Sequence, residues 1–151
     1  MTHIGNISLL QQQPIGMLAS RLIRTGSVIP ALDWAIEQAN NPQTVVMSSF
    51  QSTLEKKILR YLIAGKCGII LVLARSIYKK LPPEYAQPIA DGRMLILSLS
   101  EATRTNHHTA QRRNEYIAQN AASLVFISLN QHSTLNAIYQ QYQTIKNAIS
   151  L

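Results

Sequence analysis

The chain has 151 residues, of which 46% are hydrophobic and 14% charged, a composition that excludes a mostly disordered protein. Fourteen Lys and Arg residues against seven Asp and Glu give a net charge of +7, which favours either a polyanion or a small anionic ligand. The longest apolar stretch, residues 67–74, is shorter than the ~20 residues of a membrane span, and one cysteine excludes an internal disulfide.

Five short apolar runs occur in chain order at residues 15–19, 44–47, 68–74, 94–97 and 124–127. They are continuous rather than alternating, which is typical of strands buried on both faces. Between and after them we expect helices over residues 27–40, 52–64, 83–90, 109–120 and 133–148. This alternation predicts one α/β domain, residues 1–151, with a mainly parallel sheet of about five or more strands covered on both sides. Because no leader segment opens the sequence, we expect a soluble cytoplasmic protein.

Local signals mark the boundaries of the second helix. Ser52 and Glu55 have the spacing of a capping box, in which each side chain bonds the backbone of the other residue. We expect Gly65 to end the helix in the left-handed conformation that glycine allows. Trp34 and Cys67 stand among apolar residues, and we expect both side chains in the core.

Hydroxyl and basic side chains follow several of the apolar runs, where ligands bind in parallel sheets. They include Ser20, Arg21, Arg24, Thr25, Ser48, Ser49, Gln51, Arg75, Lys79 and Lys80. Free amides at the helix N-termini there would also suit a phosphate group. Helix capping remains the alternative for each hydroxyl alone, but together these residues predict an anion site at one edge of the sheet. Lys56, Lys57 and Arg60 on the second helix are either a solvated face or a DNA-facing stripe.

A series of motifs occurs in an order typical of one protein family. The motifs are Gly5-Asn6, Ala19-Ser20-Arg21, the segment 47–56, Gly65-Lys66, the segments 74–77 and 92–98, and Arg113-Asn114-Glu115. Over most of residues 4–139 the chain therefore resembles the DNA-processing protein A (DprA/Smf) family, a branch of the Rossmann-like SLOG superfamily.

The resemblance implies a Rossmann-like three-layer sandwich and a non-enzymatic protein that binds single-stranded DNA, needs no cofactor and forms homodimers. Ser20 and Arg21 would contact phosphate, and Arg113 would begin a helix beside the pocket. The full candidate set for nucleic acid or phosphate is Ser20, Arg21, Thr25, Ser48, Ser49, Gln51, Arg75, Arg113 and Asn114. Because the superfamily also contains nucleotide sensors, a module for a nucleotide or another small anion remains an alternative.

Three departures from the family pattern add a further alternative. Ala19 and Ser49 stand where the family has glycine, and the segment 130–134 contains no glycine. Glycine lets a backbone approach phosphate closely, so its loss also fits a partner-binding module whose ligand site has decayed.

Other motifs have simpler explanations. Gly65-Lys66 follows a helix rather than preceding one, which is the wrong order for a phosphate-binding loop. His107-His108 has no suitably spaced further ligand, so we expect no metal site. Phe50 and Tyr78 follow strands, and we expect their rings to be available for stacking on bases.

Overall fold

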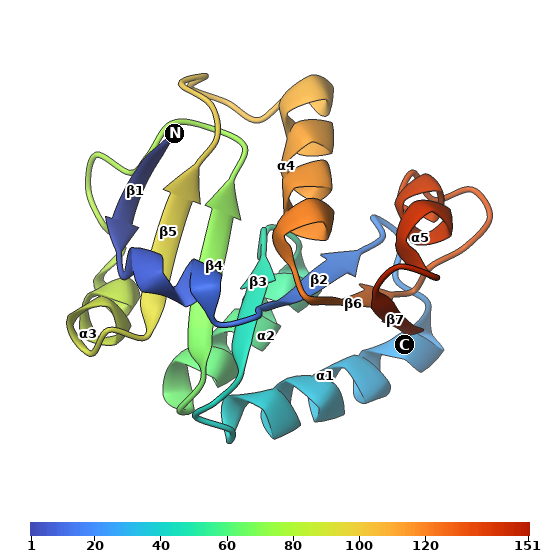
Figure 1. Cartoon of the computed structure of the whole chain (residues 1–151), viewed down its shortest axis with the longest axis horizontal. Helices are drawn as coiled ribbons and strands as arrows, with labels where there is room; N and C mark the ends of the chain where they lie inside the picture. Colours follow the sequence, from blue (N-terminus) through green and yellow to red (C-terminus); the bar gives the residue numbers. More distant parts are fainter.

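A computed structural model describes residues 1–151 of the chain (Figure 1). Its strands are β1 (Thr2–Gly5), β2 (Ile15–Ala19), β3 (Val45–Ser48), β4 (Gly68–Leu73), β5 (Met94–Ser98), β6 (Ser123–Ile127) and β7 (Asn147–Ser150). Its α-helices are α1 (Thr25–Ala39), α2 (Thr53–Ala64), α3 (Ala86–Ala90), α4 (His107–Asn120) and α5 (Asn136–Tyr142), with 3-10 helices η1 (Ile7–Gln11) and η2 (Pro83–Tyr85). None of the helices combines the length and the apolar composition that a membrane span requires.

The strands form one seven-stranded sheet in the order β1-β5-β4-β3-β2-β6-β7. All neighbouring pairs are parallel except β1 with β5. The chain moves outward from β2 through β3 and β4 to β5, and then returns to place β6 on the other side of β2. This reversal of strand order is the mark of a Rossmann-like sheet, so the predicted fold class is confirmed.

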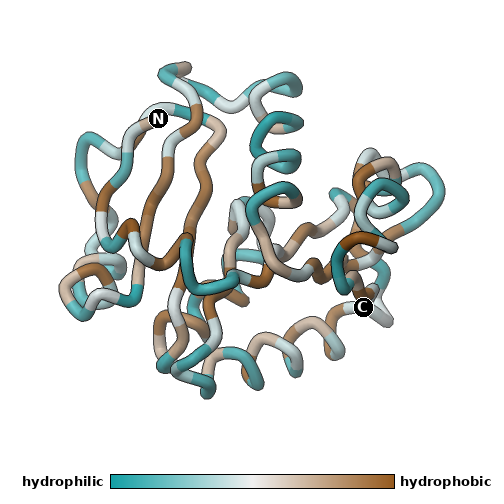
Figure 2. The backbone as a smooth tube through the Cα atoms, in the orientation of Figure 1, coloured by the Kyte–Doolittle hydropathy of each residue, from teal (hydrophilic) through white to brown (hydrophobic).

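Helices cover both faces of the sheet, as the sequence predicts. In β4, Ile69 and Leu71 contact a core formed with α1 and α2, while Ile70 and Val72 contact a second core formed with η1, α4 and α5. The alternation of side chains along a strand separates the two cores. Figure 2 shows that the central strands are mostly hydrophobic, whereas α4 beside them is mostly hydrophilic. The three-layer arrangement is therefore confirmed.

Several local predictions are also confirmed. Ser52 Oγ accepts a hydrogen bond from the Glu55 amide at 3.2 Å, and a Glu55 carboxylate oxygen accepts one from the Ser52 amide at 3.0 Å. Trp34 and Cys67 are buried. This capping box fixes the first turn of α2 shortly after β3, and that turn holds Glu55 beside the site described below.

The predicted helix over residues 133–148 is wrong at its end. Only α5 is helical, and β7 pairs with β6 in parallel, with Ile149 beside Val125. This pairing satisfies the backbone hydrogen-bonding groups at the outer edge of β6. No local pattern in the sequence indicates such a pairing. The strand β1 was not predicted because four residues without an apolar run give no periodic signal.

The left-handed conformation predicted for Gly65 is also wrong, since its φ is −92°. A glycine is needed there for a different reason: a Cβ atom would collide with the carbonyl oxygen of Ala39. The ends of α1 and α2 therefore lie against each other.

Candidate functional site

A pocket of about 480 Å³ opens at the carboxyl ends of β3 and β4. Its lining comes from the loop after β3, from α2, from the loop after β4, from η2 and from α4. The polar and aromatic lining residues are Ser49, Phe50, Gln51, Lys56, Arg60, Arg75, Tyr78, Glu84, Tyr85, Thr105 and Arg113. We call this cavity the Arg113 pocket, after its most buried charged residue. Four of the predicted residues, Ser49, Gln51, Arg75 and Arg113, meet here.

The charge around the Arg113 pocket is predominantly positive. Lys56 and Arg60 are exposed on α2, and Arg75 is half-buried after β4. Glu84 is the only carboxylate among the lining residues. A partly enclosed cavity with this balance attracts anions.

Arg113 is a buried cation whose hydrogen bonds all go to neutral groups. Its side chain is 9% exposed. Nη1 donates to Gln51 Oε1 at 2.5 Å, and Nε and Nη2 donate to Asn114 Oδ1 at 3.4 and 3.3 Å. Burial lowers the pKa of the guanidinium, and the negative charge of Glu55 partly opposes this shift. A buried arginine without a hydrogen-bonded carboxylate is suited to receive an anionic ligand.

Glu55 occupies the turn in which serines were predicted to hold phosphate. Its carboxylate is 6% exposed and accepts a hydrogen bond from Ser49 Oγ at 3.0 Å. Ser48 is fully buried, and its Oγ donates to the carbonyl oxygen of Met17 at 2.8 Å. Both hydroxyls therefore have partners within the protein, and the buried Ser48 side chain has no access to a ligand. An anion in the pocket would therefore meet the arginine side chains rather than these two hydroxyls.

Aromatic rings form the wall next to Arg75. The Arg75 guanidinium carbon lies 5.1 Å from the centroid of the Tyr78 ring, and Tyr78 meets Tyr85 edge to face at 6.1 Å. Burial, followed by the neighbouring Tyr78, raises the pKa of Tyr85, so this phenol is neutral at pH 7. Phe50 also lines the pocket, but it is 3% exposed and packs in the core, so its ring offers little surface for the predicted stacking on a base.

The other predicted residues do not line the Arg113 pocket. Asn114 lies with Arg113 midway along α4, so the prediction that these two residues begin a helix is wrong. Ser20, Arg21 and Thr25 form a separate group after β2. Ser20 is 5% exposed, and its Oγ lies 3.0 Å from Ser133 Oγ. Arg21 is exposed, and Thr25 is the exposed first residue of α1. The predicted edge of the sheet therefore carries two groups rather than one shared cavity, and anion binding by this second group stays a prediction.

Sequence reasoning reached some of the lining residues only as alternatives. Lys56 and Arg60, which fitted either a solvated face or a DNA-facing stripe, line the pocket, whereas Lys57 does not. Tyr85 was not predicted, because its position depends on how the segment 75–92 returns across the sheet. No three His, Cys, Asp or Glu side chains gather in a group that could hold a metal ion.

No protein-family model matches the chain, and no curated protein matches it by sequence. Its structure is similar to DNA processing protein A (DprA) from Streptococcus pneumoniae, with a TM-score of 0.75 and 14% identity over 98% of this chain and 53% of that one. It is also similar to DNA processing protein A from Helicobacter pylori, whose structure addresses the single-stranded DNA binding mode of that protein. That match has a TM-score of 0.72 and 16% identity over 98% of this chain and 69% of that one. The chain thus has a DprA-like fold and spans about half the length of the pneumococcal protein.

Proposed function

We propose that this chain is a non-enzymatic protein that binds single-stranded DNA in the Arg113 pocket. The observation that carries the proposal is the buried guanidinium of Arg113, which opens onto a cationic cavity and bonds only neutral amide oxygens. The DprA-like fold supports the choice of ligand, because the H. pylori protein of this fold binds single-stranded DNA.

The lining suggests how one stretch of backbone and its base would bind. Arg113 and Arg75 would contact a phosphate inside the pocket, and Lys56 and Arg60 would contact neighbouring phosphates at its entrance. The ring of Tyr78, already stacked by Arg75, offers a surface for a base. Stacking and phosphate contacts are tolerant of sequence, so we expect little base preference.

A binding role fits the reactive side chains better than catalysis does. Cys67 is a buried thiol, and its pKa is raised to about 11, chiefly by that burial, which keeps it protonated. Both carboxylate oxygens of Glu55 accept hydrogen bonds from its own turn. Neither group is positioned as a nucleophile or a general base for a ligand in the pocket.

The proposal is tested by substituting Arg113 and its sequence neighbour Arg112. Arg113→Gln removes the charge but keeps a polar side chain, and we expect affinity for a labelled single-stranded oligonucleotide to fall about tenfold or more. Arg112 is exposed on α4 and does not line the pocket, so Arg112→Gln is the matched control. Thermal melts verify that both variants fold. Absence of wild-type binding at low salt, or equal losses in both variants, would contradict the proposal.

A nucleotide is the second candidate ligand, because about 480 Å³ lies within the range of small-molecule pockets. The two candidates differ in a thermal-shift experiment with mononucleotides and oligonucleotides at equal phosphate concentration. A ligand that binds only the native state raises the melting temperature. A larger shift with the oligonucleotide supports DNA, and a shift with one mononucleotide alone supports a nucleotide module.

A further inference from the structure

The outer strand β7 has one edge that pairs with no other strand of the sheet. The amide of Leu151, directly after β7, donates to the Phe126 carbonyl oxygen, and the Leu151 carbonyl oxygen accepts from the Ser128 amide. Alternate residues of a strand turn their N–H and C=O groups to opposite sides, so Ala148 and Ser150 direct theirs away from β6. Such outward groups are a template for an added strand.

The free edge of β7 lacks the residues that usually prevent added pairing. The strand contains no charged residue, proline or glycine. A lysine often protects an edge of this kind, but the neighbouring Lys146 does not serve that purpose. Its Nζ donates to three carbonyl oxygens at the C-terminal end of α4. The edge is therefore open to a further strand.

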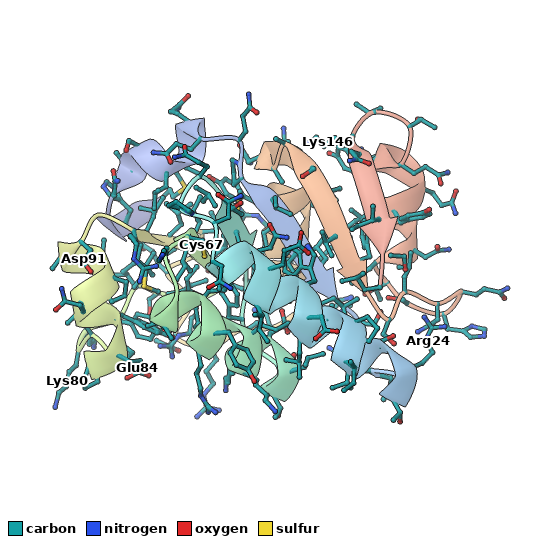
Figure 3. All side chains as sticks on the ribbon, turned by 90° about the horizontal axis from the view of Figure 1, so that it is seen from below. Arg24, Cys67, Lys80, Glu84, Asp91 and Lys146 are labelled. Carbon is teal, nitrogen blue, oxygen red and sulfur yellow. The ribbon has the colours of Figure 1, made fainter.

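One face of the sheet beside this edge is next to α1. Leu151 packs against the core formed with α1 and α2, and Ile149, two residues earlier, lies on the same face and is 44% exposed. Ser27 Oγ donates to the Leu151 carbonyl oxygen at 3.3 Å, which places the start of α1 beside the end of β7. Figure 3 shows α2 on one side of α1 and β7 on the other. An added strand would therefore run beside the flank of α1 that faces away from α2.

That flank of α1 carries two exposed carboxylates, Asp33 and Glu37. Ala39 marks the side of α1 that faces α2, because a Cβ atom on Gly65 would collide with it. With 3.6 residues per turn, Asp33 and Glu37 lie ~120° and ~160° round the helix from Ala39. Both carboxylates are thus on the side of α1 toward β7.

The two carboxylates are also level with β7. Measured from Ser27, Asp33 lies ~9 Å and Glu37 ~15 Å along α1, away from the carboxyl edge of the sheet. Measured in the same direction from Leu151, which Ser27 contacts, Asn147 at the start of β7 lies ~13 Å along the strand. A long basic side chain on an added strand, directed toward α1, would therefore meet a carboxylate.

We propose that the free edge of β7 binds an extended segment of another protein, which adds an antiparallel strand to the sheet. Ala148 and Ser150 each exchange two backbone hydrogen bonds with this segment. The side chain opposite Ile149 is apolar and covers its exposed surface. The next side chain on that face is basic and reaches Asp33 or Glu37.

A basic segment fits this edge better than a second copy of the chain does. A two-fold axis that pairs two β7 strands sets both α1 helices on the same face and brings their acidic flanks together, which like-charge repulsion disfavours. None of the residues in this contact lines the Arg113 pocket, so the proposal does not depend on DNA binding.

Labelled peptides test the proposal by fluorescence anisotropy at physiological ionic strength. An antiparallel peptide that contains Thr-Val-Thr-Lys sets its threonines opposite Ser150 and Ala148, and its valine and lysine on the α1 side. We expect this peptide to bind. N-methylation of both threonines removes the amides that face β7 and should weaken binding at least about tenfold. N-methylation of the valine and lysine, whose amides point away, is the matched control.

A second peptide tests the charge of the partner. Glutamate in place of the lysine should weaken binding, although the net charge of +7 favours an acidic peptide. A preference for lysine therefore reports the local carboxylates. The double variant Asp33→Asn and Glu37→Gln should remove this preference, whereas Glu101→Gln, an exposed carboxylate after β5, should keep it.

A backbone variant locates the site on the chain. Ala148→Pro removes one outward amide and leaves the pairing with β6, which the alternate residues make, so it should fold, lose peptide binding and keep oligonucleotide binding. Thermal melts verify the fold. Absence of wild-type binding to the lysine peptide overturns the proposal. So does equal binding of the two methylated peptides, or a lysine preference that survives the loss of both carboxylates.

Discussion

Two buried charges on different helices, Arg113 in α4 and Glu55 in the first turn of α2, have different hydrogen-bond partners. Glu55 accepts hydrogen bonds from Ser49 Oγ and from the Ser52 amide, so its charge is satisfied inside its own turn. Arg113 has only the neutral oxygens of Gln51 and Asn114. Burying a charge costs free energy unless it is paired, and a bound anion would supply the partner that Arg113 lacks. If the proposed DNA ligand binds here, we therefore expect its phosphate on the arginine side of the pocket.

The buried thiol of Cys67 gives a prediction at high pH. Its pKa is about 11 in the folded chain against an ordinary value of 9.0, chiefly because burial disfavours the thiolate. The unfolded chain therefore loses this proton first, and the free energy of unfolding falls as pH rises from 9 to 11, by about 2 to 3 kcal/mol. Urea unfolding of the wild type and of Cys67→Ala at several pH values isolates this contribution from the tyrosines and lysines. Equal slopes in both proteins would contradict it.

At the scale of single elements, Lys146 ties the C-terminal end of α4 to the segment before β7. Its Nζ donates to the carbonyl oxygens of Ala118, Gln119 and Ala121 at 2.5, 2.7 and 2.7 Å (Figure 3). These are carbonyl groups that a helix end leaves without intrahelical partners, and a positive charge there also complements the helix dipole.

Lys146→Met should therefore destabilise the protein by about 1 to 2 kcal/mol, because it keeps the aliphatic stem and removes three charged hydrogen bonds. Urea unfolding measures this loss. Lys66→Met is the matched control, since Lys66 is an exposed lysine outside this contact. A loss no larger than in the control would show that the contacts to α4 contribute nothing.

Elements whose signal is local were predictable from sequence, and elements made by long-range pairing were not. The five continuous apolar runs gave β2 to β6, and the capping box gave the start of α2. By contrast, β7 exists because β6 has a free edge, and β1 exists because β5 has one. Short strands of this kind depend on partners far away in the chain, so their own residues carry little information.

At the scale of the whole molecule, strand order decided which predicted residues meet. Loops after β3 and β4 adjoin each other and join α4, which brings Gln51, Arg75 and Arg113 together. The loop after β2 faces β6 instead, where Ser20 meets Ser133. Composition and motifs identified residues at the correct edge of the sheet, but the division into two groups depends on topology that periodicity does not encode.

The net charge of +7 predicts that DNA binding depends strongly on salt concentration. The number of cations in the Arg113 pocket predicts the slope of that dependence. Four cations line it: Lys56, Arg60, Arg75 and Arg113. At ~0.7 counterions released per phosphate contact on a single strand, log affinity should fall with log salt at a slope of about −2.8. A fourfold rise in salt then weakens binding roughly fiftyfold.

Removing two of these cations distinguishes DNA binding at the pocket from binding to the general positive charge of the surface. The double variant Lys56→Gln and Arg60→Gln should reduce the slope by about 1.4, whereas Lys66→Gln, outside the pocket, should leave it unchanged. Fluorescence anisotropy titrations at several salt concentrations measure the slope directly. If both variants change it equally, the phosphates contact a diffuse positive surface and not this pocket. If only the double variant changes the slope, the DNA backbone passes the entrance formed by α2. Lys56 and Arg60 are then close enough to the phosphates to displace the counterions bound to the DNA.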